Sequence, residues 1–307
     1  MKILITGGAG FIGSHIVDAY LKNGHEVIII DNLSTGKREN INPKAKFFEC
    51  DICSDDARKI IEKERPEILN HQAAQIDILI SVSEPATDIK INMMGFVNLL
   101  EAGRKSGLRK VLLASSGGAV YGEQKEFPAT EDHPTWPTSP YGLNKLMCEK
   151  YLYYYQIQYG IPYVALRYAN VYGPRQNALG EAGVVAVFSS KMLKGEQPVI
   201  NGDGKQTRDY VYVSDVVEAN RLALKDKTIG AYNIGTGVET DVNAIFLALK
   251  EFTESKCKEN HGPAKAGEQQ RISISSAKII KELGWNVSVP FDKGMNLTAE
   301  WFKKQIK

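Results

Sequence analysis

Residues 2–14 read KILITGGAGFIGS and set the architecture expected for the rest of the chain. Residues 2–6 are a short apolar run, typical of a strand that is buried on both faces of a parallel sheet. Gly7, Gly10 and Gly13 follow, and a helical pattern comes next. Such a turn lets the backbone approach a pyrophosphate, and the helix N-terminus offers free N–H groups to it. The stretch therefore predicts a dinucleotide-binding loop.

The next strand pattern, at 26–30, leads to Asp31. An acidic residue about 20 positions beyond the glycines is where the hydroxyls of an adenosine ribose are bound. A carboxylate there repels a 2′-phosphate, so Asp31 favours NAD over NADP. Lys37 and Arg38 lie just downstream and keep NADP open as the less favoured alternative.

Short apolar strands alternate with helical patterns through the first half of the chain, which predicts a parallel sheet covered on both faces. The strands are expected at 2–6, 26–30, 46–50, 67–71, 110–115 and 163–168, and the helices at about 12–22, 54–64, 86–105 and 140–158. We therefore predict an α/β fold with a Rossmann-type doubly wound sheet, and residues 1–170 as the NAD-binding domain.

The pattern loosens after about residue 170. Helices are expected near 182–194, 214–225, 240–251 and 290–305, and short strands near 198–201, 210–213 and 231–234. The stretch 202-GDGKQ-206 is interpreted as a hairpin turn. Residues 171–307 are thus expected to form mainly a smaller α/β substrate-binding domain, with about 205–235 returning to the first domain.

Composition excludes several classes of function. The formal net charge is +2, so no strong field indicates nucleic acid or a membrane surface. No apolar run reaches the ~18 residues of a membrane-spanning helix. The four cysteines form no metal-ligand set with histidines, so no metal is predicted. The N-terminus lacks the pattern of a signal peptide, and a soluble cytoplasmic protein is expected.

The stretch 136-WPTSPYGLNKLMCEKY-151 carries a candidate catalytic pair. Ser139 can cap a helix and Pro140 suits its first position. Tyr141 then lies in the first turn, and Lys145 lies one turn later on the same face. A nearby ammonium lowers the pKa of a phenol, so this pair suits the removal of a proton from a hydroxyl.

A hydroxyl near the pair is predicted from 114-ASSGGAVYG-122, at the end of the 110–115 strand. Ligands of such sheets bind at the carboxyl ends of the strands. Either Ser115 or Ser116 could therefore hydrogen-bond the reacting oxygen, and the other serine would serve the turn. Ser116 is the preferred candidate.

With these pieces the chain resembles the extended short-chain dehydrogenase/reductases, most closely the UDP-glucose/UDP-galactose 4-epimerases. The matching motifs span nearly the whole chain in order: GGAGFIGSH, DNLSTG, HQAAQ, SSGGAVYG, SPYGLNK, RYANVYGPRQ, GDGKQTRDYVYV and ELGW. The resemblance implies an NAD-dependent C4 epimerase of a UDP-sugar that works through a transient 4-keto sugar. It also implies a homodimer formed by the helices at about 86–105 and 140–158.

The resemblance also implies roles for individual residues. The implied cofactor contacts are Gly7, Gly10, Phe11, Ile12, Gly13, Asp31, Asn32, Asp51, Ile52, Ala73, Ala74, Asn92, Tyr141 and Lys145. Proton chemistry is assigned to Tyr141, Lys145 and Ser116. Substrate contacts are assigned to Ser116, Asn170, Arg208 and Glu268.

Four positions depart from the family pattern. Gly117 stands where a Ser or Thr is frequent, Asn201 where an aromatic side chain commonly lies near the uracil, and Lys265 where an arginine is usual. Ile272 stands at the position that controls room for a 2-N-acetyl group. Ile272 keeps UDP-N-acetylhexosamines open as substrates, Asn201 leaves the choice of nucleotide base open, and UDP-hexuronates remain a further alternative.

Two other kinds of function remain as alternatives. Nucleotide-sugar dehydratases need an acid close to the V-Y-G motif, and the run from Gly117 to Val120 holds none. This absence argues against elimination and for an epimerase over other nucleotide-sugar oxidoreductases or dehydratases. A non-catalytic NAD-binding sensor is less favoured, because Tyr141 and Lys145 are both present.

Overall fold

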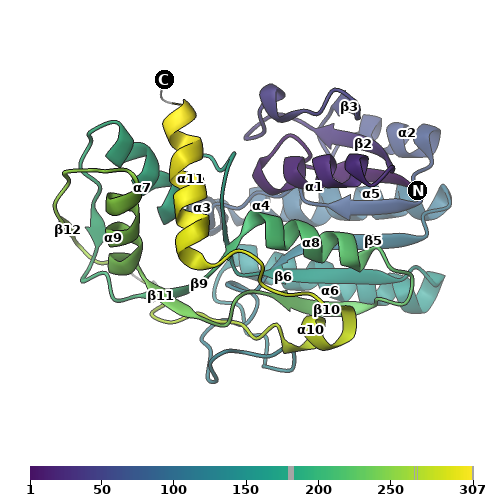
Figure 1. The fold of residues 1–307 in the computed structure, drawn as a ribbon. Helices are drawn as coiled ribbons and strands as arrows, with labels where there is room; N and C mark the ends of the chain where they lie inside the picture. The colour runs from purple at the N-terminus through teal and green to yellow at the C-terminus, as the bar shows by residue number, and fades with distance from the viewer. Residues whose placement is uncertain (179–182, 266, 268, 306–307) are drawn as a thin grey trace. The chain divides into compact units, whose positions relative to one another are not determined.

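The computed structural model describes residues 1–178, 183–265, 267 and 269–305, and the chain divides into two compact units (Figure 1). The first unit comprises Met1–Gly122, Pro134–Arg167 and Val217–Tyr232, and the second comprises Glu123–His133, Tyr168–Val216 and Asn233–Lys307. The chain therefore passes between the units five times, after residues 122, 133, 167, 216 and 232.

The sheet of the first unit has, within the described residues, seven strands in the order β10-β6-β5-β4-β1-β2-β3. Its strands are β1 (Lys2–Thr6), β2 (Glu26–Asp31), β3 (Lys46–Glu49), β4 (Ile68–His71), β5 (Lys110–Ser116), β6 (Tyr163–Tyr168) and β10 (Gly230–Ile234). The pairs β1–β2, β2–β3, β1–β4 and β4–β5 are parallel. From β3 the order runs 3-2-1-4-5-6, which is that of a doubly wound nucleotide-binding sheet and confirms the predicted fold class.

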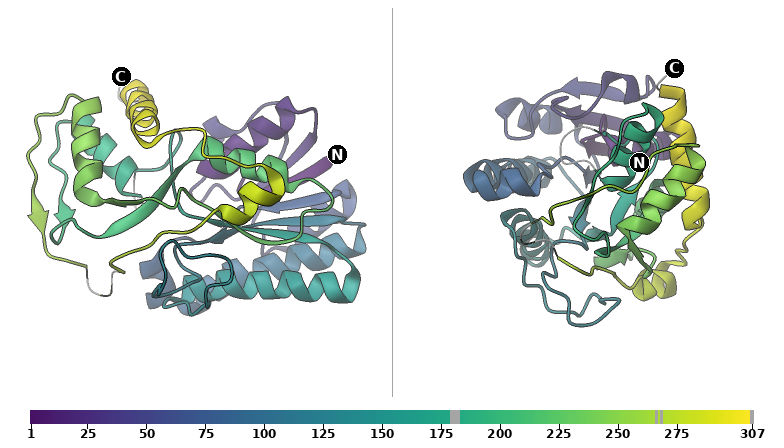
Figure 2. Two further views of the ribbon diagram at one scale, coloured as in Figure 1. Left: turned by 60° about the horizontal axis from the view of Figure 1, so that its bottom comes forward. Right: turned by 90° about the vertical axis from the view of Figure 1, so that its left-hand side faces the viewer.

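Helices cover both faces of this sheet (Figure 2). On one face lie α1 (Phe11–Lys22) and α8 (Val213–Ala223), where the Tyr20 hydroxyl donates to the Asn220 carbonyl at 3.1 Å and the Asn70 side chain donates to the Asn220 side chain at 3.0 Å. On the other face lie α2 (Asp55–Glu64), α5 (Gly95–Lys105) and α6 (Pro140–Tyr159). Burying each large aliphatic side chain in these layers contributes about 1.5–3 kcal/mol.

The helix expected at 86–105 is present but is not uniform. It consists of α4 (Pro85–Ile89), a π-helical turn η2 (Lys90–Met94) and α5. A further short helix, α3 (Ile78–Ser83), was not expected. The Asp77 side chain caps it by accepting the N–H of Ile80 at 3.0 Å. The segment after β4 is therefore a series of short helical pieces that lead into α5.

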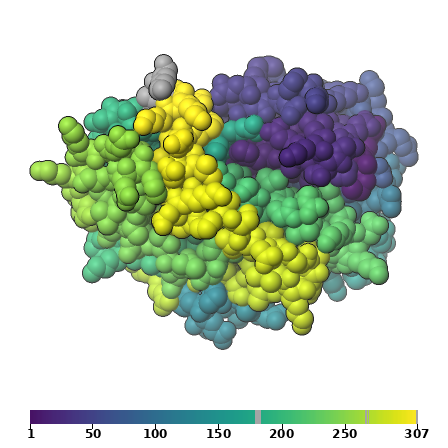
Figure 3. Space-filling model, viewed as in Figure 1, coloured from purple at the N-terminus to yellow at the C-terminus, as the bar shows by residue number. Residues whose placement is uncertain are grey.

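The second unit contains two small sheets and four helices among its described residues. One sheet has the order β11-β9-β7, and the other pairs β12 with β8. The strands are β7 (Asn170–Tyr172), β8 (Ile200–Asn201), β9 (Thr207–Tyr212), β11 (Glu239–Asp241) and β12 (His261–Gly262). The helices are α7 (Val184–Leu193), α9 (Val242–Phe252), α10 (Ala277–Leu283) and α11 (Phe291–Gln305). Figure 3 shows α11, in yellow, at the surface.

The hairpin expected at 202–206 is wrong, because β8 and β9 do not pair with each other. The carbonyl of Gly204 instead accepts the N–H groups of Val242 and Asn243 at the start of α9, at 3.0 and 3.4 Å. Gly202 and Gly204 have φ values of +64° and +72°, which suit glycine. The glycines therefore redirect the chain towards a helix terminus and do not close a hairpin.

Candidate active site

The glycine-rich turn between β1 and α1 has no room for side chains. A Cβ on Gly13 would lie 2.1 Å from the carbonyl oxygen of Gly7, and a Cβ on Gly7 would lie 2.8 Å from the amide nitrogen of Ala73. Gly7 also has a φ of +69°. Only glycine satisfies these constraints, so the turn brings bare backbone to the carboxyl end of β1.

The turn ends at the N-terminus of α1, which begins at Phe11 with Gly10 as its N-cap. Gly10 itself has no side chain to cap this terminus, and the first turn of α1 contains no acidic residue. The N–H groups of Phe11, Ile12 and Gly13 are those that a helix leaves without an intrahelical partner. This terminus, joined to a cradle that a Cβ would fill, fits the pyrophosphate of a dinucleotide.

Asp31 and Asn32 lie at the carboxyl end of β2, beside this turn. The Asp31 carboxylate is buried and accepts the N–H groups of Ala9 at 2.9 Å and Leu33 at 2.8 Å. Asn32 donates to the Asp51 carboxylate at 3.1 Å. These bonds fix acceptor oxygens at the strand ends, and such oxygens suit the hydroxyls of a ribose.

Asp51 and Ile52 follow β3. Burial by itself would raise the pKa of Asp51, but hydrogen bonds from the Cys53 amide and from Asn32 outweigh it and hold the pKa below its ordinary value. Ile52 is buried against Gly95, where a Cβ would approach the Ile52 side chain to 2.8 Å. Asp51 therefore offers a fixed negative acceptor beside a buried apolar surface.

Ala73, Ala74 and Asn92 lie after β4 and on the π-helical turn. The Ala73 amide donates to the Thr6 hydroxyl at 3.2 Å, and both alanines are partly buried. The Asn92 side chain is buried and bonds to both backbone groups of Gln75, each at 2.9 Å. The chain after β4 is therefore locked to the helix that follows it.

Tyr141 and Lys145 lie on the first two turns of α6, as predicted. Ser139 caps the helix by accepting the N–H of Gly142 at 3.2 Å, and Pro140 is its first residue. Lys145 is only 4% exposed and donates to the Ala114 carbonyl of β5 at 2.9 Å. Its Nζ lies 5.8 Å from the centre of the Tyr141 ring. The pair therefore meets at the carboxyl end of a central strand.

The environment of the pair shifts both of its pKa values. Part of the Tyr141 side chain is exposed, but burial around the phenol raises its pKa to about 12, against an opposing hydrogen bond from Ser116. Burial lowers the pKa of Lys145, and nearby negative charge opposes that shift. Both groups are thus moved towards their neutral forms, so added positive charge is needed to favour the phenolate.

Ser115 and Ser116 have different hydrogen-bond partners. The Ser115 hydroxyl donates to the Glu149 carboxylate at 2.5 Å, and Glu149 forms a buried ion pair with Arg167 at 2.7 Å. Ser116 instead hydrogen-bonds Tyr141. The sequence interpretation missed Glu149 and Arg167, although Glu149 continues the four-residue spacing of Tyr141 and Lys145.

Of the residues expected to bind the substrate, Ser116 belongs to the first unit, Asn170 and Arg208 belong to the second, and Glu268 lies outside the described residues. Asn170 opens β7 opposite Tyr210 of β9, while Arg208 lies two residues before Tyr210. Side chains two apart on a strand share a face, so Asn170 and Arg208 lie on the same face of this small sheet. Arg208 donates to the Thr207 carbonyl at 2.7 Å.

Of the four positions that depart from the family pattern, Gly117 lies in the first unit and the other three lie in the second. Asn201 is on β8 and is half-buried, and Lys265 is exposed. Ile272 is 6% exposed, and its N–H donates to the Thr207 carbonyl at 3.2 Å. The backbone of Ile272 is thus tied to β9, the strand that carries Arg208.

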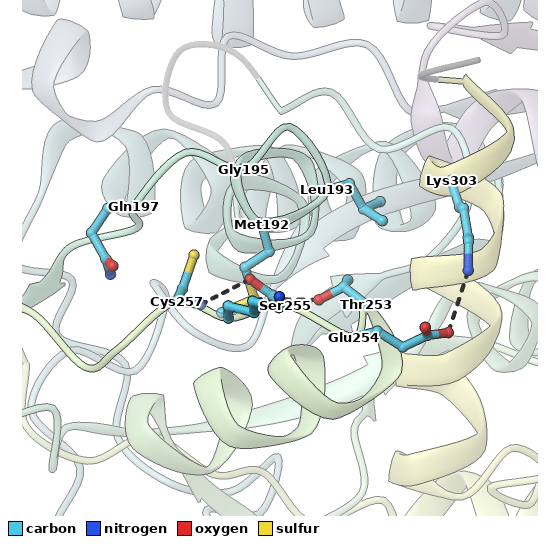
Figure 4. Close-up of a pocket in the computed structure, with 10 residues that line it drawn as sticks. Met192, Leu193, Gly195, Gln197, Thr253, Glu254, Ser255, Cys257 and Lys303 are labelled. Carbon is cyan, nitrogen blue, oxygen red and sulfur yellow. Dashed lines mark hydrogen bonds and ion pairs between the residues drawn. The ribbon is translucent and has the colours of Figure 1, made fainter.

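The second unit also contains a hollow of about 800 Å³, shown in Figure 4. It lies beyond the last turns of α7 and α9 and beside the end of α11. Its ion pair joins Lys303 to Glu254 at 3.5 Å, and the Thr253 hydroxyl lies 3.7 Å from the Met192 sulfur. The described lining residues bring together no acid–base pair resembling Tyr141 and Lys145, so this hollow is not the candidate active site.

Comparison with known proteins identifies the family. Residues 3–235 match the NAD dependent epimerase/dehydratase family. A UDP-glucose 4-epimerase of Mycolicibacterium smegmatis is 40% identical over 311 residues, which cover 99% of each chain. The chain therefore belongs to this family, and the expectation of an NAD-dependent enzyme is confirmed.

Two solved structures agree with that assignment. The UDP-glucose 4-epimerase of Thermotoga maritima with UDP-glucose has a TM-score of 0.98 and 47% identity, covering 100% of both chains. The UDP-glucose 4-epimerase of Thermus thermophilus in complex with NAD has a TM-score of 0.94 and 42% identity, covering 99% of both chains. The arrangement of strands and helices here is thus that of solved epimerases.

Proposed function

We propose that this chain is a UDP-glucose 4-epimerase, which interconverts UDP-glucose and UDP-galactose through a 4-keto sugar. The observation that carries the proposal is the cluster of Tyr141, Lys145 and Ser116 at the carboxyl end of β5. It brings together a proton acceptor and a cation on α6 and a hydroxyl donor at the end of β5. The similarity to epimerases over the whole chain supports the same reaction.

In this mechanism Tyr141 takes the proton of the sugar 4-hydroxyl. Ser116 hydrogen-bonds the reacting oxygen, and the Lys145 ammonium stabilises the phenolate. Bound NAD⁺ supplies the hydride acceptor and donor at C4 and brings the positive charge that favours the phenolate. The keto sugar turns about its link to the diphosphate, and Tyr141 then returns the proton to the inverted C4 oxygen.

We assign the cofactor to the first unit and the nucleotide sugar mainly to the second. The cofactor residues are those expected from the sequence, from the glycine turn through Asp31, Asn32, Asp51, Ile52, Ala73, Ala74 and Asn92 to Tyr141 and Lys145. Ser116 contacts the reacting sugar. Asn170 and Arg208 hold the nucleotide diphosphate and Glu268 lies near the uridine ribose, so that binding energy remote from C4 retains the intermediate.

The test is to incubate the purified protein with UDP-hexoses, UDP-N-acetylhexosamines and UDP-hexuronates separately, with and without added NAD⁺, and to resolve the products by chromatography. We expect UDP-glucose and UDP-galactose to reach one equilibrium mixture from either side without net NADH. Epimerisation confined to the N-acetyl or uronate sugars would reassign the substrate. Net NADH or loss of water would exclude the epimerase mechanism.

A homodimer is proposed from the outer face of α6. Leu143, Met147, Tyr151 and Tyr154 recur at helical spacing and are 37–51% exposed. A second copy of this face would cover them, and an apolar stripe of this kind is unusual on a monomer. Sedimentation of the protein and of Tyr154→Glu tests the proposal, since the variant should dissociate to monomers.

We also propose a cytoplasmic location. All four cysteines are unpaired, as expected in a reducing compartment. No helix in the described part of the chain is long and apolar enough to cross a membrane. Fractionation of the native host, with detection by an antibody, tests this location.

A further inference from the structure

A buried carboxyl group lies beside the proposed catalytic pair, and the mechanism above gives it no role. Asp88 is the fourth residue of α4 and has no exposed surface. Its side chain accepts the amide N–H groups of Gln75 and Asn92, each at 2.9 Å, and of Asn144 at 2.5 Å. A buried carboxyl of this kind needs such partners, because an unpaired one is costly to desolvate.

The backbone fixes the direction of two of these bonds. The Asn92 side-chain oxygen accepts the Gln75 N–H, so its amino group must face Asp88. The Gln75 side-chain oxygen likewise accepts the Asp77 N–H at 2.5 Å, so its amino group also faces Asp88. Both of these bonds end on Oδ1 of Asp88, which therefore acts as an acceptor, and Oδ2 is bonded to the Asn144 side chain.

The third bond connects Asp88 to the catalytic helix. Asn144 lies between Tyr141 and Lys145 on α6 and is 5% exposed. Asp88 lies on α4, so this bond joins two helices through residues that are 56 positions apart in the chain. The first turns of α6 are therefore held from one side by Ala114 through Lys145 and from the other by Asp88 through Asn144.

The charges around Lys145 single out Asp88. Tyr141 and Cys148 on the same helix are both protonated, since burial raises each pKa to about 12. His71 of β4 is neutral, since burial lowers its pKa to about 3. On the next turn Glu149 is committed to Arg167. Among the described groups that face Lys145, Asp88 is thus the carboxylate without a cation bonded to it.

We propose that Asp88 is a positioning residue for the proton transfer. Through Asn144 it fixes the turn that carries Tyr141 and Lys145, and its negative charge sets the pH range in which the pair is active. The inference rests on the proposed function only for its kinetic test.

The direction of the pH effect follows from the sign of the charge. A nearby carboxylate raises the pKa of Tyr141 and also that of Lys145. The acid limb of the rate profile reports formation of the Tyr141 phenolate, and the alkaline limb reports loss of the Lys145 ammonium. Removing the charge therefore moves both limbs to lower pH. A substitution that only displaces Tyr141 and Lys145 lowers kcat at every pH and leaves both limbs of the profile at the same pH.

The first variant is Asp88→Asn, which removes the charge and can keep the bonds. Its side-chain oxygen can accept from Gln75 and Asn92, and its amino group can donate to Asn144 once that amide is reversed. The second variant, Asn144→Ala, removes the link and keeps the charge. Asp56→Asn, on the exposed face of α2, is the control for loss of one carboxylate.

We expect both limbs of the kcat profile to move to lower pH in Asp88→Asn only. Asn144→Ala should reduce kcat about tenfold without moving the limbs, because it removes one hydrogen bond to a charged group. An unmoved Asp88→Asn profile would overturn the electrostatic role. An unchanged kcat in Asn144→Ala would overturn the positioning role, and it does so even where Asp88→Asn does not fold.

A second readout separates this inference from the proposed function. The ionisation of Tyr141 can be followed without substrate by NMR of isotope-labelled tyrosine, with its signal assigned from Tyr141→Phe. We expect Tyr141 to ionise at lower pH in Asp88→Asn than in the unmodified protein. An identical titration contradicts the inference. A shifted titration in a protein that epimerises no UDP-sugar would uphold it while the proposed function fails.

Discussion

Two regions differ in how firmly their candidate residues are held. One is the start of α6 in the first unit, which carries Tyr141 and Lys145, and the other is the small β11-β9-β7 sheet of the second unit. Lys145 is 4% exposed and bonded to another strand, whereas Asn170 is exposed and Arg208 is half-buried and bonds to the carbonyl of its own neighbour. Acid–base chemistry needs groups fixed to within a fraction of an ångström. Residues that hold a flexible ligand can be ordered by that ligand, so exposure there is compatible with function.

The largest expected effect is a fall in kcat when Tyr141 of the first unit is replaced by Phe. The variant lacks the phenol oxygen and keeps the ring, so kcat should fall by roughly 10²–10⁴ while NAD binding and the fold are retained. Single-turnover kinetics and a cofactor titration measure the two effects. Turnover close to that of the unmodified protein would remove Tyr141 from the mechanism.

The second contrast concerns one ion pair in each unit. Arg167→Met leaves the buried Glu149 without its partner, which should lower the free energy of unfolding by about 3–5 kcal/mol. Arg271→Ala breaks the more exposed pair with Glu239, which should lower the free energy of unfolding much less, because solvent screens an exposed pair. Urea unfolding measures both.

A double variant sharpens this contrast. Replacing Glu149 by Leu together with Arg167→Met removes both buried charges and should recover part of the loss. Equal losses from Arg167→Met and Arg271→Ala would show that the two units are equally tolerant of a broken pair.

A smaller effect is expected from Arg208→Ala in the second unit. Loss of a charge-assisted contact to a diphosphate costs about 1.5–3 kcal/mol, so KM for the UDP-sugar should rise roughly 10–100-fold. Arg221→Ala, on the exposed face of α8 and paired with Glu218, is a matched control that should leave KM unchanged. A fall in kcat without a change in KM would place Arg208 in the chemical step.

An acid sensitivity of the first unit is expected at His71. Its pKa is about 3 when folded, below the value of 6.5 for an unburied histidine, so the unfolded chain binds the extra proton. Stability is therefore complete above pH 6.5 and falls as the pH drops from there towards 3, by at most about 1.4 kcal/mol per pH unit. Urea midpoints between pH 7 and 5 should show a weaker dependence in His71→Gln, and His261→Gln should match the unmodified protein.

The two units also differ in how far their structure could be predicted from the sequence. α6 was expected at 140–158 and is observed at Pro140–Tyr159, because a cap, a proline and Gly160 are local signals. α3 was missed, because ILISVS is almost uniformly apolar and shows no periodicity. The short strands β7, β11 and β12 were also missed, because partners distant in sequence decide their existence.

Long-range contacts likewise explain what could not be predicted in the candidate site. The sequence could not show that Ser115 bonds to Glu149, which lies 34 residues away. Membership of residues 123–133 in the second unit depends on Asn233, which bonds to Glu131 at 2.7 Å and to Ala129 at 3.0 Å. The motifs predicted which residues assemble, and the distant contacts determine how each one is oriented.

The five passages of the chain between the units have a consequence for inheritance and for engineering. A gene fragment ending near residue 170 would lack residues 217–232, which supply Asn220 beneath Asn70 and most of the edge strand β10. Such a fragment would expose one face of α1 and leave a polar group of the core unpaired. Recombination can therefore exchange the second unit of this enzyme only in several pieces at once, so this unit is expected to evolve mainly by point substitution.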